Sequence, residues 1–165
     1  MKIKTLKIIG TIISFILPFI LHFLYDLFPN FLTSIISPVN ESIWEHMKIL
    51  FGSIIISGII QKIIAKRKKV PANNICFSNF LSALLSIPLF LIIYLPINYI
   101  LGENLIVTLI IMFIVILLVQ ILSYYIMKIK DLKFEKITII FTIIVYIIFT
   151  ILTYYPLNNY LFIEK

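Results

Sequence analysis

The chain has 165 residues, a formal net charge of +7 and a composition that is 62% hydrophobic. A mean hydropathy of +1.14 excludes a water-soluble globule, because too few polar residues remain to cover a folded surface. The lone cysteine, Cys76, excludes an internal disulfide and any zinc knuckle built on paired cysteines. The length leaves room for one structural unit, so we expect a single helical bundle over residues 1–165.

Five apolar stretches are long enough to cross a membrane, since about 20 residues span roughly 30 Å of hydrocarbon as a helix. The first stretch follows a basic start, Met1-Lys2-Ile3-Lys4, and continues to Phe28 without a cleavage site between small residues. We therefore expect a retained span and not a removed signal peptide. The sequence predicts an all-α, polytopic membrane protein with five transmembrane helices at about 6–28, 38–65, 75–97, 105–127 and 137–155.

Basic residues gather beside alternate connections between these stretches. They precede the first span, follow the second, and join the fourth to the fifth: Lys2, Lys4, Lys7, Lys62, Lys66, Arg67, Lys68, Lys69, Lys128, Lys130, Lys133 and Lys136. Because cytoplasmic loops carry an excess of lysine and arginine, the pattern predicts the N-terminus inside and the C-terminus outside.

The same clustering accounts for the positive charge without nucleic acid, for which the sequence carries no recognition motif. Abundant isoleucine, lysine and asparagine are typical of an AT-biased bacterial genome. We therefore expect a multi-pass protein of the bacterial cytoplasmic membrane, with the lipid bilayer as its surroundings and no nucleic acid as partner.

A short polar segment, Ser37 to Lys48, interrupts the apolar sequence on the outer side of this predicted topology. It holds two of the seven acidic residues and one of the two histidines. Ionisable groups at membrane boundaries are costly, so they usually have a function or a partner. Ser37 followed by Pro38 is typical of a helix start and predicts a second helix from about Pro38 to Ala65.

Two faces rich in polar side chains are expected to meet at this outer end. Helical spacing places Glu41, Trp44, Glu45 and Lys48 on one face of the second helix. The same spacing places His22, Tyr25 and Asp26 on one face of the first helix. The connection between the two helices is short, which predicts that they are antiparallel neighbours. The candidate metal ligands are His22, Asp26, Glu41 and Glu45, and the candidate supporting residues for ligand binding are Tyr25, Asn40, Trp44 and His46.

Three functions fit such a cluster. Carboxylates and imidazoles can bind a cation, such as a divalent metal ion, or a small polar ligand. Alternatively, a metal-dependent membrane enzyme could cut a lipid or peptide bond at the outer interface, with Glu41 or Glu45 as the catalytic base. In the third hypothesis the protein is a structural or accessory subunit. The carboxylates then stabilise the N-terminus of the second helix, or they bind basic residues of a partner membrane protein or of a second copy. In this hypothesis Lys48 pairs with Glu45, and Trp44 anchors the helix at the membrane interface.

The polar residues of the remaining segments favour structural roles. Gln120, Ser123, Tyr124 and Tyr125 are expected to make hydrogen bonds between helices. The closing segment from Tyr154 to Phe162 is too apolar for a free tail, so we expect it to fold back against the outer ends of the bundle.

Three blocks of the sequence resemble a family of small, uncharacterised integral membrane proteins from clostridial and related bacteria. They are His22-Phe23-Leu24-Tyr25-Asp26, Pro38-Val39-Asn40-Glu41-Ser42-Ile43-Trp44-Glu45-His46-Met47-Lys48 and Tyr155-Pro156-Leu157-Asn158-Asn159-Tyr160-Leu161-Phe162. The run PVNESIWEH is the most specific part. The resemblance implies an outward-facing polar site on a five-span bundle and supplies no activity, cofactor or catalytic residue.

Overall fold

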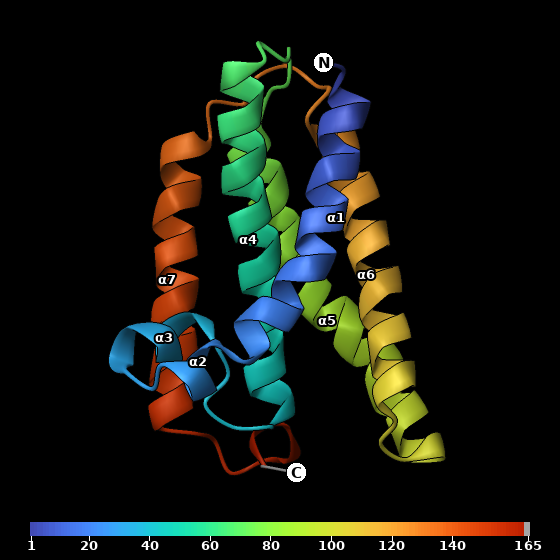
Figure 1. The fold of residues 1–165 in the computed structure, drawn as a ribbon, viewed down its shortest axis with the longest axis vertical. Coiled ribbons are helices and arrows are strands. Elements are labelled where there is room, and N and C mark those ends of the chain that lie inside the picture. The colour runs from blue at the N-terminus through green and yellow to red at the C-terminus, as the bar shows by residue number, and fades with distance from the viewer. Residues whose placement is uncertain (164–165) are drawn as a thin grey trace.

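The computed structural model describes residues 1–163 and confirms an all-α protein with five helices long and apolar enough to cross a membrane in that range (Figure 1). They are α1 (Ile3–His22), which continues into the short α2 (Leu24–Leu27), α4 (Ile43–Arg67), α5 (Ile75–Leu101), α6 (Leu105–Ile126) and α7 (Glu135–Tyr154). A short helix α3 (Phe31–Ile36) precedes α4, and a 3₁₀ turn η1 (Tyr160–Phe162) follows α7.

Helix α4 lies at the centre of the bundle. It packs against α1 and α5, while α6 closes a four-helix group by packing against both α5 and α1. Helix α7 lies beside α4 and α5, on the side away from α1 and α6 (Figure 1). The outward faces of α6 and α7 expose isoleucine, leucine and phenylalanine, as expected for surfaces that face lipid.

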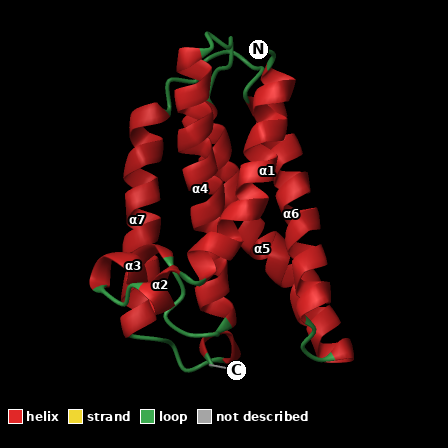
Figure 2. Cartoon of the chain, in the orientation of Figure 1, coloured by secondary structure: helices red, strands yellow, loops and turns green. Residues whose placement is uncertain are grey.

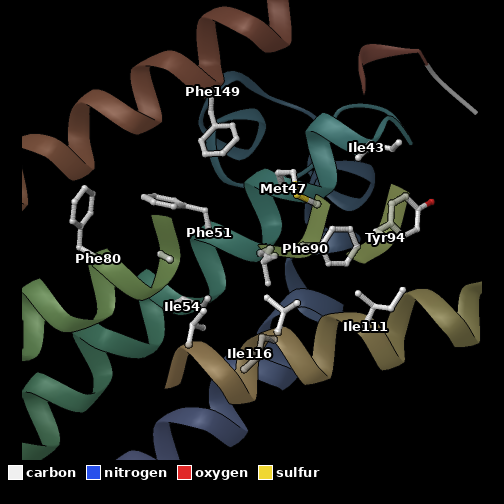
Figure 3. Close-up of a cluster of buried hydrophobic side chains, with 14 residues drawn as sticks. Ile43, Met47, Phe51, Ile54, Phe80, Phe90, Tyr94, Ile111, Ile116 and Phe149 are labelled. Atoms are coloured by element: carbon white, nitrogen blue, oxygen red, sulfur yellow. The ribbon is translucent and has the colours of Figure 1, made fainter. Parts of the chain in front are cut away.

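Aromatic side chains join α7 to the central helices. Phe51 of α4 contacts Phe80 of α5 edge-on and packs on Phe149 of α7, with ring centroids 6.4 and 5.7 Å apart (Figure 3). On the other side of α4, Ile54 and Ile116 fill the space between α4 and α6. All five side chains are buried or nearly so, and they fix the register of the helices that carry the polar segment.

The loops gather at the two ends of the bundle (Figure 2). The N-terminus and the α4–α5 and α6–α7 loops share one end, which carries the three basic clusters and is called the basic end below. The α1–α4 crossover, the α5–α6 turn and η1 share the opposite end. Helices α1 and α4 are antiparallel neighbours, so the predicted pairing of the first two spans is confirmed.

Helix α4 begins five residues later than the sequence suggested. Its first residue is Ile43, and the side chain of Ser42 caps it by accepting a hydrogen bond from the backbone N–H of Glu45. Ser37 instead ties the crossover to the end of α1: its hydroxyl donates to the Leu21 carbonyl at 2.5 Å. The predicted start at Pro38 is therefore wrong, and Glu41 lies in the turn before the helix.

The crossover from α1 to α4 is an ordered segment that reaches α7. Asn30 caps α3 by accepting hydrogen bonds from the backbone N–H groups of Leu32 and Thr33. The Ser34 hydroxyl lies 2.9 Å from that of Tyr154 at the end of α7. The first span is thus broken at Phe23, and the chain after the break runs sideways across the end of the bundle.

Candidate metal centre

Three side chains converge between the end of α1 and the start of α4. His22 Nε2 lies 3.7 Å from Glu41 Oε1, and His46 Nε2 lies 3.4 Å from Glu41 Oε2. The two imidazole ring centroids are 5.5 Å apart. Each residue offers one ligand atom, and these three atoms all lie within 4.8 Å of one another. The break after α1 and the turn before α4 together make this approach possible.

The orientation of His46 is fixed by the backbone of its own helix. Its Nδ1 lies 2.9 Å from the carbonyl oxygen of Ser42, one turn earlier. A carbonyl only accepts, so Nδ1 carries the hydrogen and donates it. Ring nitrogen Nε2 therefore faces Glu41 either with a lone pair, as a metal ligand requires, or with a second proton. A lone pair on Nε2 would face the lone pairs of the Glu41 carboxylate, so a cation between them would be favoured.

Glu41 is placed by a turn and not by a helix. Asn40 Oδ1 accepts a hydrogen bond of 3.0 Å from the backbone N–H of Ser42, which closes an Asx turn around Glu41. The Glu41 side chain remains 54% exposed, whereas the side chains of His22 and His46 are 29% and 36% exposed. The cluster is therefore half-buried, with the carboxylate on its solvent side.

Two hollows of different character adjoin the cluster. A cavity of about 270 Å³ between α1, α4 and α6 has His22 and His46 in its wall and is otherwise lined mainly by apolar side chains such as Phe19, Leu50 and Met112. A second hollow, of about 290 Å³, contains Glu41 and His46 beside Asn104 and Thr108. His46 belongs to both, so the cluster lies where an apolar cavity meets a more polar one.

Glu45 is separated from this cluster and forms a buried ion pair. Its Oε2 lies 2.6 Å from Lys48 Nζ and accepts a hydrogen bond from the backbone N–H of Val39, while Oε1 accepts a hydrogen bond from Thr153 of α7. Lys48 also donates to the carbonyl of Ser34 at 2.7 Å. Helical phase explains the separation, because Glu45 turns toward α7 whereas His46 turns toward α1. The pairing of Lys48 with Glu45, expected under the structural hypothesis, is present.

The other candidate residues lie around the cluster without joining it. Asp26 is exposed on α2, because the break at Phe23 ends the helical phase that linked it to His22. Tyr25 contributes its backbone N–H to the Ser37 hydroxyl. Trp44 stacks on Phe162 of η1, with centroids 4.9 Å apart, so the predicted return of the closing segment is confirmed.

Sequence reasoning assigned His46 only a supporting role and overlooked the contribution of the α5–α6 turn. The hydrogen bond from His46 to Ser42, four residues earlier, could have been inferred once the helix start was placed at Ser42. The position of Asn104 and Thr108 beside Glu41 and His46 could not be inferred from the sequence, because these two residues are distant along the chain.

At the basic end, a polar cluster of a different kind surrounds Lys7, which the sequence suggested was only a topology determinant. Its ammonium donates to Gln61, Asn79 and Ser123, which lie on three other helices. The expected interhelical hydrogen bonds of Gln120 and Ser123 are present, to Ser14 and Lys7.

Comparison with known proteins gives a family and no activity. No curated protein matches the chain, and no solved structure matches it. The model of a family of unknown function, DUF6512, matches residues 1–165. The chain, which combines five helices long enough to cross a membrane with a half-buried cluster of two histidines and a glutamate, therefore belongs to the family DUF6512.

Proposed function

We propose that this integral membrane protein binds a divalent transition-metal ion, of which zinc is the best fit, through His22 Nε2, His46 Nε2 and the Glu41 carboxylate. The observation that carries the proposal is the convergence of these three ligand atoms within 4.8 Å. Two imidazoles and one carboxylate form a donor set that suits zinc and related ions.

The distances support tetrahedral coordination. Two ligand atoms that each lie about 2.05 Å from a tetrahedral zinc ion are about 3.4 Å apart. His22 Nε2 lies 3.7 Å from Glu41 Oε1 and His46 Nε2 lies 3.4 Å from Glu41 Oε2, both close to this spacing. The three ligand atoms all lie within 4.8 Å, so the widest pair would have to close by up to about 1.4 Å. Glu41 is exposed and lies in a turn, so it can contribute to that closure without moving a helix.

A second candidate function, metal-dependent hydrolysis at the membrane surface, is favoured by the two adjoining hollows. Three protein ligands leave a fourth position for water, as in catalytic zinc sites. The apolar cavity beside His22 and His46 suits an acyl chain, and the polar hollow beside Glu41 suits a head group. Under this hypothesis the substrate is a lipid and not a peptide, and Glu45 is not the base, because it is buried in its ion pair.

The predicted topology would place this centre at the outer face of the bacterial cytoplasmic membrane. The three basic clusters lie at the opposite end of the bundle, which supports this orientation. A centre on that face would take up its metal from outside the cytoplasm.

Elemental analysis of the purified protein in detergent tests the proposal. We expect about one zinc ion per wild-type chain after dialysis against a zinc buffer, and loss of that ion in Glu41→Gln and in His46→Gln. Asp26→Asn is the matched control, since it removes an exposed carboxylate at the same end of the bundle but outside the cluster. Wild-type protein without metal, or equal metal in Glu41→Gln, would overturn the proposal.

A further inference from the structure

A groove between α1 and α6 lies at the basic end, far from the candidate metal centre. Its volume is about 610 Å³, within the range of ligand-binding pockets. Along α1 its wall runs from Lys4 to Ile16, which is about 18 Å of helix and close to the depth of one membrane leaflet. Apart from its basic end, the wall is formed mainly by apolar side chains, including Ile8, Ile12, Phe113, Leu117 and Ile121.

The basic end of the groove holds a buried lysine without a carboxylate partner. Lys7 is 5% exposed, and its ammonium donates to Gln61 Oε1, Asn79 Oδ1 and Ser123 Oγ at 3.3, 3.2 and 2.6 Å. All three acceptors are neutral, and within residues 1–163 no carboxylate forms an ion pair with Lys7. Lys48, the other buried lysine, has Glu45 as its partner. A buried cation without a counter-charge is costly, so an anion near Lys7 would be favoured.

Lys4 extends this charge to the membrane surface. It lies one helical turn before Lys7 on α1, is exposed, and lines the same groove. An anionic head group at the mouth of the groove would contact Lys4 directly and lie within Coulomb range of Lys7.

A second, independent feature points to a hydrogen-bond donor inside the groove. Gln120 lines the groove and is 2% exposed. Its Nε2 donates to the Ser14 hydroxyl at 2.9 Å, but its Oε1 has no hydrogen-bond partner among the described residues. Gln120 lies three residues before Ser123 on α6, so its backbone is about 4.5 Å deeper than that of Ser123, to which Lys7 donates. A buried acceptor without a partner is unfavourable, and a hydrogen bond from a ligand hydroxyl at this depth would remove that cost.

We propose that the groove binds an anionic glycerophospholipid with a single acyl chain. The phosphate lies against Lys4 and compensates Lys7, the free glycerol hydroxyl one step deeper donates to Gln120 Oε1, and the acyl chain follows the apolar wall between α1 and α6. The order phosphate, hydroxyl and chain matches the order of lysines, Gln120 and apolar residues along the groove. This site is separate from the proposed metal centre and does not depend on it.

Binding of monoacyl glycerol phosphate to the detergent-purified protein, measured by native mass spectrometry, tests the assignment. We expect wild type to bind it more tightly than monoacylglycerol, which lacks the phosphate, and more tightly than diacyl glycerol phosphate, which lacks the free hydroxyl. Lys4→Gln should weaken binding about fivefold, since one lysine near an anionic head group contributes about 1 kcal/mol. Lys2→Gln, an exposed lysine at the same end outside the groove, should leave binding unchanged.

Two further variants test where the acyl chain and the free glycerol hydroxyl of the lipid bind. Ile12→Trp fills the groove and should abolish binding, whereas Ile59→Trp on a lipid-facing surface of α4 should not. Gln120→Met should remove the preference for the monoacyl over the diacyl lipid. Equal binding by wild type, Lys4→Gln and Ile12→Trp, or no preference of the wild type for the monoacyl lipid, would overturn the proposal. Glu41→Gln should bind the lipid normally, so this test fails or succeeds independently of the metal.

Discussion

Lys48 Nζ lies 2.6 Å from Glu45 Oε2 with both side chains almost completely buried, in the first two turns of a helix long and apolar enough to cross a membrane. The pair is completed by the hydroxyl of Thr153 and the carbonyl of Ser34, which come from α7 and α3. A buried ion pair adds little net stability over a well-packed apolar pair, but removal of one partner leaves an unpaired charge. The loss of stability is therefore expected to be largest when only one residue of the pair is replaced.

Lys48→Met should lower the free energy of unfolding by about 3–5 kcal/mol, because Glu45 would then be buried without a cation. The double variant Lys48→Met/Glu45→Met should lose less than the sum of the two single losses. Unfolding by SDS in mixed micelles, followed by circular dichroism, measures these differences. Lys62→Met is the control, because its ion pair with Glu135 is half-exposed and should contribute about 0–1 kcal/mol. Equal losses for Lys48→Met and Lys62→Met would contradict the expectation.

Gly58→Ala should destabilise the contact between α4 and α5. A Cβ atom at this position would lie 2.7 Å from Asn79 Cβ, close to the backbone of α5, so the helices would have to separate. We expect a loss of about 1–3 kcal/mol in the same unfolding assay, as for other overpacked interiors. Ile59→Ala, the next residue and 54% exposed, should cost much less. A smaller loss for Gly58→Ala than for Ile59→Ala would show that the two helices pack less closely than described.

The only tryptophan reports on the closing segment. Trp44 stacks on Phe162 and also packs on Phe149, with ring centroids 4.9 and 5.0 Å apart. Phe162→Ala should expose the indole and shift its fluorescence emission to longer wavelength. Leu157→Ala, an exposed residue of the same segment, should leave the emission unchanged. Identical spectra for wild type and Phe162→Ala would mean that η1 does not cover Trp44 in detergent.

Cysteine labelling tests the orientation in the membrane. In a Cys76→Ala background, a membrane-impermeant maleimide added to intact cells should label Asn159→Cys and not Lys68→Cys. Both positions are exposed and lie at opposite ends of the bundle. The opposite labelling pattern would place the metal centre in the cytoplasm and the lipid groove in the outer leaflet.

The architecture followed from the sequence because its determinants are local. Each span is a continuous apolar run, and the proline and polar breaks between runs fix the connections. The start of α4 does not follow as directly, because two serines, Ser37 and Ser42, both have the features of a helix cap. Ser42 is followed by Glu45 at the spacing of a capping box, and this pattern would have identified it.

The candidate site was predicted only in part because its geometry depends on two departures from regular helix. Helical spacing brought His22 and Glu41 to the same end of the bundle, but it also predicted Asp26 and Glu45 beside them. The break at Phe23 and the turn at Glu41 exclude those two carboxylates and admit His46. Lys7 could not be distinguished from a surface lysine, because its three acceptors come from three other helices.

The origin of each cluster along the chain has a consequence for biosynthesis. His22, Glu41 and His46 are all present once α4 has been made, so the proposed metal ion can be captured while the second half of the chain is still on the ribosome. The pair of Glu45 and Lys48 is different, because Thr153 belongs to the last helix. Until α7 has been made and packed, Glu45 and Lys48 lack their hydrogen bonds with Thr153. A chain truncated before α7 would therefore expose the Glu45–Lys48 pair on the surface that α7 normally covers, a feature by which quality-control proteases could recognise it.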